Sequence, residues 1–506
     1  MEGLFWKILL TGVVTLLTCV LWWVRDRRRK HAFFSELGIA GPKPHILWGN
    51  RNHLRKDHIK VMGEWIKTYG KVFGFYRSQD PLLVVCDTEM IKQCFVKEFN
   101  AFHDRPLPPL PVEPFASSLP FLNGEEWKKL RTILNPAFSA AKMRLVTPTI
   151  NKCADEFVDV LTESAKKGQV VDVYQAAQGL SLDVITKCAL AWQVDCQRNP
   201  DEPLLQELQN VFPSSDNLVT RMAFWFPVLR KAIGLLHEAT GLSAIQRKIL
   251  ANLRDVIRLR RCGQAPPVPD ILQMMLDAQS DASSDPKIRK DERDLLSEDR
   301  FVLANCFIFI FAGFDTTALA LAYTLYLLAK HPEEQDRLLR ELTDASADNQ
   351  DPSSEELHKL KRLEMVLKES LRMYPPNVGF VSRVCQRDIT VMGQLIPAGT
   401  AVTVPVWHLH RDPDYWPEPY KFDPERFSEG QERHIPEAYV PFGLGPRSCI
   451  GKRFAMIELK ATLCKVVRRF RILLCEETQD PPKIYVPNSQ TYPVNGVRLK
   501  LECRDP

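Results

Sequence analysis

The sequence predicts a mainly α-helical protein with a small β part, an α+β fold formed by one large domain behind an N-terminal transmembrane helix. Three observations predict it. Apolar residues recur at three- and four-residue spacing through the middle of the chain, strand-like alternation is confined to two regions, and one apolar run lies at the N-terminus. The 506 residues, of which 45% are hydrophobic, are enough to bury a substantial core.

Composition excludes several classes of protein. The net charge of +5 is small for this length and gives no reason to expect nucleic-acid binding, which requires a basic domain or stripe. The 13 cysteines have no repeated spacing and no C-x-x-C pair, so they are predicted to be reduced thiols in a cytosol-like environment.

The N-terminal apolar run extends from Ile8 to Val24 and has two tryptophans near its end. It is close to the shortest length that crosses a bilayer, and the aromatic residues followed by arginines are typical of an interface with a cytoplasmic flank. A cleaved signal peptide would carry its positive charge before the apolar run and a small-residue cleavage site after it. A retained anchor is therefore favoured.

The anchor is predicted to end where basic residues begin, which divides the chain into three parts. Residues 1–24 form the transmembrane anchor, and 25–44 form a basic stop and a stiff hinge containing Pro42 and Pro44. Residues 45–506 form a single domain without internal repeats. The polar stretch 280–297 is predicted to be a solvated loop within it.

Helices and strands are predicted from the same periodicities. The predicted helices are 124–134, 150–164, 204–212, 244–260 and 301–330. Strands are predicted at 82–86 and within 389–407, with turns at Gly393 and 397–399.

The helix at 301–330 is apolar enough to be mistaken for a second membrane span. Polar side chains such as Asn305, Asp315 and Thr324 interrupt it, and such groups are costly in lipid. A long helix through the domain core is therefore predicted.

The strongest local motif is the segment 442–451, Phe-Gly-Leu-Gly-Pro-Arg-Ser-Cys-Ile-Gly. Its glycines and proline predict a tight loop whose N–H groups can point at one sulfur, with a helix at 452–467 directly behind it. Cys449 then lies near a helix N-terminus, where the dipole favours the thiolate. Such a thiolate suits an axial ligand of iron, and Arg447 can meet a carboxylate. The spacing of the glycines does not fit a phosphate-binding loop.

Two pairs of residues share a helix face. Glu369 and Arg372 are three residues apart, which by itself predicts only a surface ion pair. Trp127 and Arg131 are four residues apart, and both offer N–H donors to a carboxylate, although a generic amphipathic helix would look the same.

A stripe of small residues in the long helix predicts space beside it. Ala312, Gly313, Thr316 and Ala320 fall on one side, leaving room for a flat cofactor and a small ligand. Asp315 directly before Thr316 is an acid followed by an alcohol, which can relay protons. The alternatives are that these polar groups are satisfied inside the core, or that Asp315 pairs with a neighbouring base.

The cysteine loop resembles the ligand signature of the cytochromes P-450 at each key position, namely Phe442, Gly445, Arg447, Cys449 and Gly451. The resemblance extends in the family's order from the hinge to near the C-terminus. The phrases at 307–313 and 383–385 look most like the drug-metabolising family-three enzymes and their relative thromboxane synthase, which are animal microsomal enzymes.

The resemblance implies roles for individual residues in binding haem b. Cys449 would be the thiolate ligand of iron, Thr316 and Asp315 would deliver protons, and Glu369, Arg372 and Arg426 would support the haem pocket. Further residues would contact the haem: Trp127, Arg131, Ala312, Gly313, Arg383, Phe442, Gly445, Arg447 and Gly451.

The resemblance also implies the reaction, which is insertion of one atom of O2 into a lipophilic xenobiotic, steroid or fatty-acid-like molecule. The chain has no dinucleotide fingerprint, so NADPH would supply electrons through a separate flavoprotein, NADPH–cytochrome P-450 reductase, possibly with cytochrome b5. Lys128, Lys129, Lys452 and Arg453 would form a basic docking face. The location implied is the endoplasmic reticulum membrane, with a single span and the catalytic domain on the cytosolic side.

Two alternatives remain from the sequence. One is a peroxide isomerase or lyase of the same fold, as in thromboxane synthase, which the acid–alcohol pair argues against. The other is a membrane scaffold without catalytic activity, which the intact cysteine loop argues against.

Overall fold

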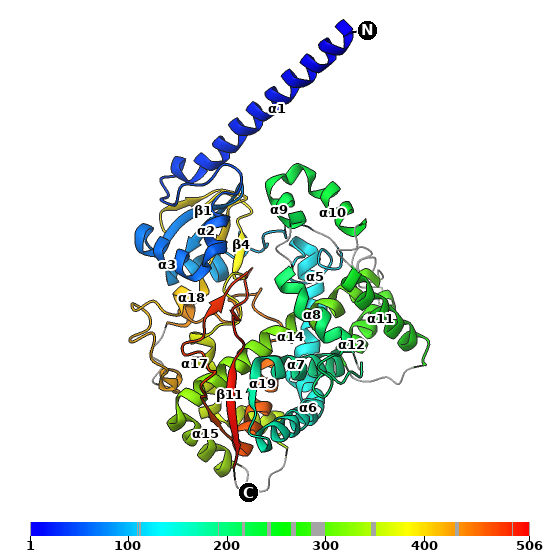
Figure 1. Cartoon of the computed structure of the whole chain (residues 1–506), viewed down its shortest axis with the longest axis vertical. Coiled ribbons are helices and arrows are strands. Elements are labelled where there is room, and N and C mark those ends of the chain that lie inside the picture. Colours follow the sequence, from blue (N-terminus) through cyan, green and yellow to red (C-terminus); the bar gives the residue numbers. More distant parts are fainter. Residues whose placement is uncertain are drawn as a thin grey trace.

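The structure is a computed structural model that describes residues 2–108, 110, 113–190, 192–214, 218–239, 244–264, 270–284, 299–345, 351–430, 435–487 and 489–504. One long helix, α1 (Glu2–Glu36), projects from one end of a helical body (Figure 1). The mainly helical α+β class with small sheets is confirmed.

The first helix is longer than the apolar run that predicts it. It continues through the basic residues to Glu36, so a hinge can begin only after the basic stop, at Leu37. Arginine and lysine are good helix formers, and nothing between residues 25 and 36 interrupts the helix. None of its apolar window is buried, and it is long and apolar enough to cross a membrane.

Helices form most of the described body. The α-helices are α2 (Arg51–Lys56), α3 (His58–Tyr69), α4 (Thr88–Lys92), α5 (Gly124–Leu134), α6 (Ala140–Lys166), α7 (Val173–Leu190), α8 (Pro203–Ser214), α9 (Leu218–Trp225), α10 (Arg230–Ala239), α11 (Ala244–Arg261), α12 (Ile271–Ser284), α14 (Asp299–Lys330), α15 (Pro332–Ala345), α16 (Ser354–Lys359), α17 (Lys361–Met373), α18 (Val406–Leu409) and α19 (Lys452–Arg469). Short helices of other types are η1 (Gln93–Lys97), η2 (Asn135–Phe138), η3 (Pro227–Leu229), η4 (Pro424–Phe427) and η5 (Pro436–Ala438).

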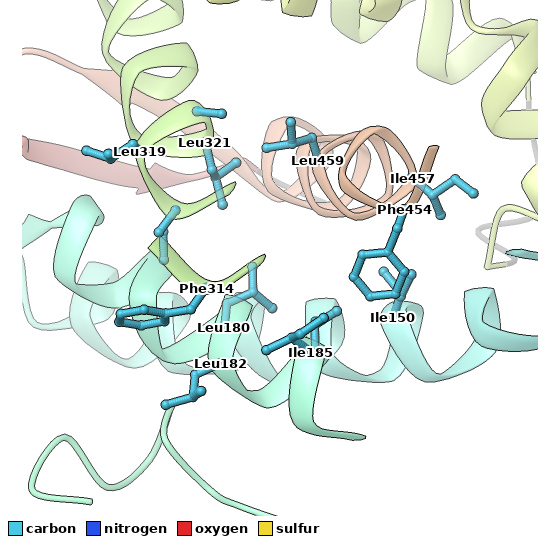
Figure 2. Packing of buried hydrophobic residues seen from close by; sticks show 14 of the residues in the cluster. Ile150, Leu180, Leu182, Ile185, Phe314, Leu319, Leu321, Phe454, Ile457 and Leu459 are labelled. Carbon is cyan, nitrogen blue, oxygen red and sulfur yellow. The ribbon is translucent and has the colours of Figure 1, made fainter. Parts of the chain in front are cut away.

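The core is built around α14. Of the apolar stretch of this helix, 78% is buried, whereas none of the apolar stretch of α1 is, so α14 is a core helix as predicted. Gly313 allows α14 to approach α7 closely, because a Cβ there would lie 3.1 Å from the Ile185 side chain. Figure 2 shows Phe314 of α14 near Leu180 of α7, and Leu459 of α19 beside the same cluster.

The strands form four small sheets. They are β1 (Val72–Arg77), β2 (Asp80–Val85), β3 (Val170–Asp172), β4 (Ser382–Val384), β5 (Ile389–Val391), β6 (Gln394–Ile396), β7 (Ala401–Thr403), β8 (Phe470–Leu473), β9 (Ile484–Tyr485), β10 (Tyr492–Pro493) and β11 (Arg498–Cys503). The sheet orders are β1-β2-β7-β4, β3-β11-β8, β5-β6 and β10-β9. Strand β4 is antiparallel to β7, which aligns Arg383 with Val402.

Most predicted elements are confirmed, with extended ends. The helix predicted at 150–164 begins ten residues earlier, because Pro148 lies inside α6 and does not mark its start. The strand region 389–407 contains β5, β6 and β7 with turns at both predicted places. The loop predicted at 280–297 is wrong for residues 280–284, which belong to α12, and 285–297 lie outside the described residues.

Candidate active site

A cavity of about 410 Å³ lies inside the domain, where α14, α5, the segment 376–383 and the cysteine loop meet. Its wall is mainly apolar and includes Phe311, Phe380 and Phe442. Four arginines and no acidic side chain line it in the described part of the chain. The site is therefore an apolar chamber with a strong excess of positive charge on its wall.

Cys449 is placed by the backbone of the predicted loop. Its N–H donates to the carbonyl of Phe442 (2.8 Å), and its side chain lines the cavity. Gly445 has φ +71°, and a Cβ there would lie 2.1 Å from the carbonyl oxygen of Phe95, so only glycine fits. Gly445 does not itself line the cavity, whereas Gly443 and Gly451 do.

The electrostatics of Cys449 differ from what the helix terminus alone predicts. Burial raises the pKa of the thiol, whereas a hydrogen bond from the Gly451 N–H and the positive charge of Arg131 lower it, and the net shift is upward. Desolvation therefore opposes the effect of the helix N-terminus on this thiol. A metal cation at Sγ would favour the thiolate, as in metal–thiolate sites.

The positive charge comes from two deeply buried arginines, Arg383 and Arg447, and two less buried ones, Arg105 and Arg131. Arg447 donates through Nη2 to the carbonyl of Leu122 (2.9 Å), and Arg383 donates through Nη2 to that of Leu444 (3.0 Å). Arg105 donates to the carbonyl of Arg447 (3.0 Å). Burial first, and then the neighbouring guanidinium groups, lower the pKa of both Arg383 and Arg447. An anion in the cavity would relieve this repulsion.

The helix α5 adds two nitrogen donors to this wall. Trp127 and Arg131 both line the cavity, and the guanidinium of Arg447 lies 4.1 Å from the centroid of the Trp127 ring. Several buried nitrogens have no hydrogen-bond partner, among them Nε of Arg105, Nε of Arg383, and Nε and Nη1 of Arg447. Unsatisfied buried donors are rare, and these four adjoin one chamber, although the Nε atoms of Arg27 and Arg77 also lack partners elsewhere. They fit a ligand with carboxylate groups, such as the two propionates of haem.

The small-residue stripe of α14 faces the cavity. Ala312, Gly313, Thr316 and Ala320 all line it, as the sequence indicates. The hydroxyl of Thr316 donates to the backbone carbonyl of Ala312 (2.7 Å). This side-chain hydrogen bond competes with the helix backbone for that carbonyl oxygen. This wall has room for a flat group beside a hydroxyl.

Asp315 is turned away from the cavity. Its Oδ1 accepts hydrogen bonds from the Tyr174 hydroxyl (2.6 Å) and Gln178 (3.0 Å), and its Oδ2 accepts one from the Tyr492 hydroxyl (2.8 Å). Burial raises its pKa, and the three donors lower it to a smaller extent. Among the described residues its hydrogen-bond partners are neutral, so Asp315 does not pair with a base there. The Tyr492 hydroxyl also lies 2.6 Å from the amide oxygen of Gln490, which lines the cavity.

A buried ion pair lies outside the cavity. Arg372 donates to both oxygens of Glu369 (2.7 and 2.8 Å), and Nε of Arg426 lies 3.4 Å from the same carboxylate. Both members of the α17 pair are fully buried, so this is not the surface pair that the spacing alone predicts. Arg372 also donates to the carbonyls of His410 and Pro419 (both 2.8 Å). The arrangement fastens the chain before the cysteine loop to α17.

The histidine pair at 408 and 410 has structural contacts. The Nε2 of His410 accepts a hydrogen bond from the N–H of Val440 (2.9 Å), and its Nδ1 lies 3.2 Å from the Arg372 carbonyl. Burial lowers its pKa far below the ordinary value, so the ring is neutral. His408 contacts the carbonyl of Ile59 (2.9 Å).

Sequence reasoning missed Arg105, a fourth arginine of the cavity. It lies in the segment 103–121, of which Leu119, Pro120 and Phe121 also line the cavity. An arginine directly before a proline-rich segment was the available signal. The segment 211–236 is also apolar, but none of its described residues lines the cavity.

Comparisons with known proteins agree with this geometry. The family model described as Cytochrome P450 matches residues 39–497. Similar proteins include cytochrome P450 3A29 of Sus scrofa, 34% identical with 94% of this chain and 93% of the relative covered. Cytochrome P450 3A7 of Homo sapiens is 34% identical with the same coverage, and cytochrome P450 3A31 of Mesocricetus auratus is 35% identical with 98% of both chains covered.

Proposed function

The chain belongs to the cytochrome P450 family and is a monooxygenase, and from this premise we propose that it inserts one atom of O2 into a lipophilic small molecule with electrons from an NADPH-dependent flavoprotein reductase. One observation carries the proposal. The only cysteine sulfur among the described lining residues shares an apolar cavity with four arginines. This combination suits an iron porphyrin, with its metal at the sulfur and its carboxylates at the guanidinium groups.

We propose that Cys449 is the iron ligand and that the arginines hold the propionates. Bound haem would supply the iron at which O2 is activated. The backbone N–H of Gly451 moderates the charge of the sulfur, and Trp127, Arg131, Arg383 and Arg447 donate to the carboxylates. Further contacts to the ring are proposed for Phe442 and Gly451 at the loop and for Ala312 and Gly313 on α14, whereas Gly445 acts by shaping the loop.

Thr316 is proposed to hold a proton at its hydroxyl beside the reacting oxygen. It lines the cavity, and its hydrogen bond to Ala312 is short-range and can be exchanged for one to a ligand. Asp315 would hold a proton at Oδ2 behind it. A protonated Oδ2 would donate to the Tyr492 oxygen, which leaves the Tyr492 hydroxyl to donate to the amide oxygen of Gln490 at the cavity wall.

The substrate is proposed to be apolar and of drug or steroid size. Phenylalanines from three separate segments, Phe121, Phe311 and Phe380, line the part of the cavity available to it. A substrate of this kind partitions into the bilayer that α1 is proposed to span. We propose a location in the endoplasmic reticulum membrane from the resemblance to microsomal enzymes, and we place the domain on the cytosolic side because basic residues follow the apolar run.

The reductase, possibly with cytochrome b5, is proposed to dock on the basic face beside the cysteine loop. Lys128, Lys452 and Arg453 are exposed, and Lys129 is half-buried. Positive charges this close to the proximal side of the site attract an acidic partner at low ionic strength.

A peroxide isomerase of the same fold is the second candidate, and the orientation of Asp315 favours it. An isomerase requires neither electrons nor a relay of protons, and this acid does not line the cavity. The experiment is turnover of lipophilic substrates by purified enzyme with NADPH and reductase, compared with turnover of an organic endoperoxide alone. Product formation that depends on NADPH and O2 supports the monooxygenase. Peroxide rearrangement without NADPH, together with no NADPH-dependent product, overturns it.

A further inference from the structure

The last turns of α1 are packed into the domain. The ring of Phe34 lies so close to Gly74 that a Cβ there would be 2.3 Å from it, and the N–H of Phe34 donates to the Tyr76 hydroxyl (3.0 Å). The His31 ring contacts the carbonyl oxygen of Ser78 at 2.9 Å. Because α1 is continuous from its exposed apolar part to these contacts, its direction is set by the domain.

Arg27 is the deepest polar contact of α1, with 1% of its surface exposed. Its Nη1 donates to the hydroxyl of Ser78 (3.0 Å), and its Nη2 donates to the carbonyl of Trp225 (2.9 Å). A buried guanidinium is costly unless it is hydrogen-bonded, so these two contacts stabilise the junction. They join residues that lie 51 and 198 positions apart in the sequence.

Ser78 continues the contact to α9. It is fully buried with φ +63°, an unusual conformation for a residue other than glycine, and its hydroxyl lies 2.8 Å from the carbonyl oxygen of Phe224. The last two carbonyls of α9 therefore accept hydrogen bonds from Ser78 and Arg27. These carbonyls form the negative end of the helix dipole, where a cation is stabilising.

Helix α9 is connected to the wall of the cavity. Ala223 of α9 and Ile233 of α10 pack against Leu110, which precedes the lining residues 119–121 in the same segment. A second contact joins α10 to the segment that contains Ser78, because Nη2 of Arg230 lies 3.4 Å from Oδ2 of Asp80. Figure 1 shows α9 and α10 at the end of the molecule from which α1 projects.

We propose that Arg27 is a positioning residue that couples the membrane anchor to the α9–α10 pair, so that a tilt of α1 in the bilayer displaces α9 and changes ligand access to the cavity. The consequence for ligand access rests on the proposed function. The coupling itself rests on the contacts of Arg27 and Ser78 and stands independently of the reaction.

Two variants and a control test the coupling in the full-length holoenzyme. Arg27→Ala removes both hydrogen bonds of the guanidinium. Ser78→Gly removes the bridging hydroxyl while relieving the backbone conformation, so it is the variant less prone to misfold. Arg28→Ala is the control, because Arg28 is the exposed neighbour on the same helix and carries the same charge.

The measurement is amide hydrogen exchange of residues 218–225 in phosphatidylcholine vesicles. Exchange is expected to be about tenfold faster in both variants and unchanged in the control, the effect of losing one charge-assisted hydrogen bond. Wild-type rates in both variants would overturn the proposal. If exchange in Arg27→Ala is faster throughout the domain, that variant is destabilised globally and Ser78→Gly alone tests the coupling. An unchanged exchange rate at residues 218–225 in Ser78→Gly then overturns the proposal.

Bilayer thickness provides the second arm, because a longer or shorter hydrocarbon core changes the tilt of a spanning helix. Wild-type exchange at 218–225 is expected to differ between short-chain and long-chain phosphatidylcholine, and this difference should be smaller in Ser78→Gly, which keeps only the direct hydrogen bond from Arg27 to the Trp225 carbonyl. A wild-type rate independent of thickness would contradict the coupling. Absence of NADPH-dependent turnover would count against the proposed function and not against the coupling, because amide hydrogen exchange does not depend on turnover.

Discussion

Arg447 is the residue on which the electrostatics of the cavity wall depend most. It is 3% exposed, lies over Trp127, and has two nitrogens without a hydrogen-bond partner. Replacing it by alanine should weaken haem binding at least about tenfold, because a charge-assisted contact to a propionate is lost. The rate of haem transfer to an acceptor apoprotein measures this. Arg453→Ala, at an exposed arginine two residues after Gly451, should leave the rate unchanged, and equal rates for both variants would contradict the assignment.

The buried carboxyl group of Glu458 should make the stability of the fold depend on pH. It is buried in α19 with one hydrogen bond, from the Ser181 hydroxyl (2.7 Å), and burial raises its pKa to about 8 from the ordinary 4.5. Between these values the folded state holds a proton that the unfolded state releases. Stability from this group is therefore full below about pH 4.5 and is lost as the pH rises to about 8.

Glu458→Gln should remove this loss while keeping an acceptor for Ser181. The variant is expected to gain apparent thermal stability over the wild type as the pH rises from 5 to 8, by an amount equivalent to roughly 3 kcal/mol. Unfolding midpoints at several pH values measure it, with Glu476→Gln as an exposed control. A constant difference across this pH range would show that Glu458 titrates normally.

At the scale of elements, α17 offers two ion pairs in contrasting surroundings. Arg372 and Glu369 are fully buried, whereas Lys361 of the same helix pairs with Glu429 at the surface. Arg372→Ala should cost about 3–5 kcal/mol, because it leaves the Glu369 carboxylate buried with the Asp423 N–H (2.9 Å) and the longer contact to Arg426 as its remaining partners. Lys361→Ala should cost less than about 1 kcal/mol. Denaturant unfolding of both variants tests this, and similar costs would contradict the structural role.

The same helix shows what a single sequence can and cannot predict about an element. Spacing places Glu369 and Arg372 on one face, but burial depends on the chain at 410–421, which lies over that face and has no sequence signal of its own. The strand β4 was missed for a similar reason. It has three residues, and its pairing with β7 is long-range, so no local periodicity indicates it.

At the scale of the whole molecule, the basic face beside the cysteine loop predicts how electrons reach the site. The triple variant Lys128→Glu, Lys452→Glu and Arg453→Glu should lower NADPH- and reductase-supported turnover at least about tenfold at low salt, by replacing attraction with repulsion. Turnover supported by an organic peroxide bypasses the reductase and should be unaffected.

The matched control reverses three exposed lysines in and just after α6, Lys152, Lys166 and Lys167. This variant has the same net charge as the docking variant, so it separates a local from a global electrostatic effect. Equal losses in the two triple variants, or a loss in peroxide-supported turnover as well, would contradict a docking face at this position.

At this scale, most residues of the site could be predicted from the sequence, but the contacts between distant segments could not. The cysteine loop, α5 and α14 have strong local patterns, and the structure brings their predicted residues to one cavity, except Gly445 and Asp315. The side of α14 on which Asp315 lies is decided by Tyr174 and Tyr492, which are 141 and 177 residues distant. Long-range partners of this kind cannot be obtained from spacing.

The central claim is that Cys449 is the thiolate ligand of a haem iron, and the most direct measurement is the carbon monoxide difference spectrum of the reduced protein. The wild type and Cys475→Ser, at a cysteine outside the cavity, should both give the red-shifted Soret band of a thiolate-ligated haem. Cys449→Ser should lose this band. A thiolate-type band that persists in Cys449→Ser, or its absence from the haem-loaded wild type, would contradict the account.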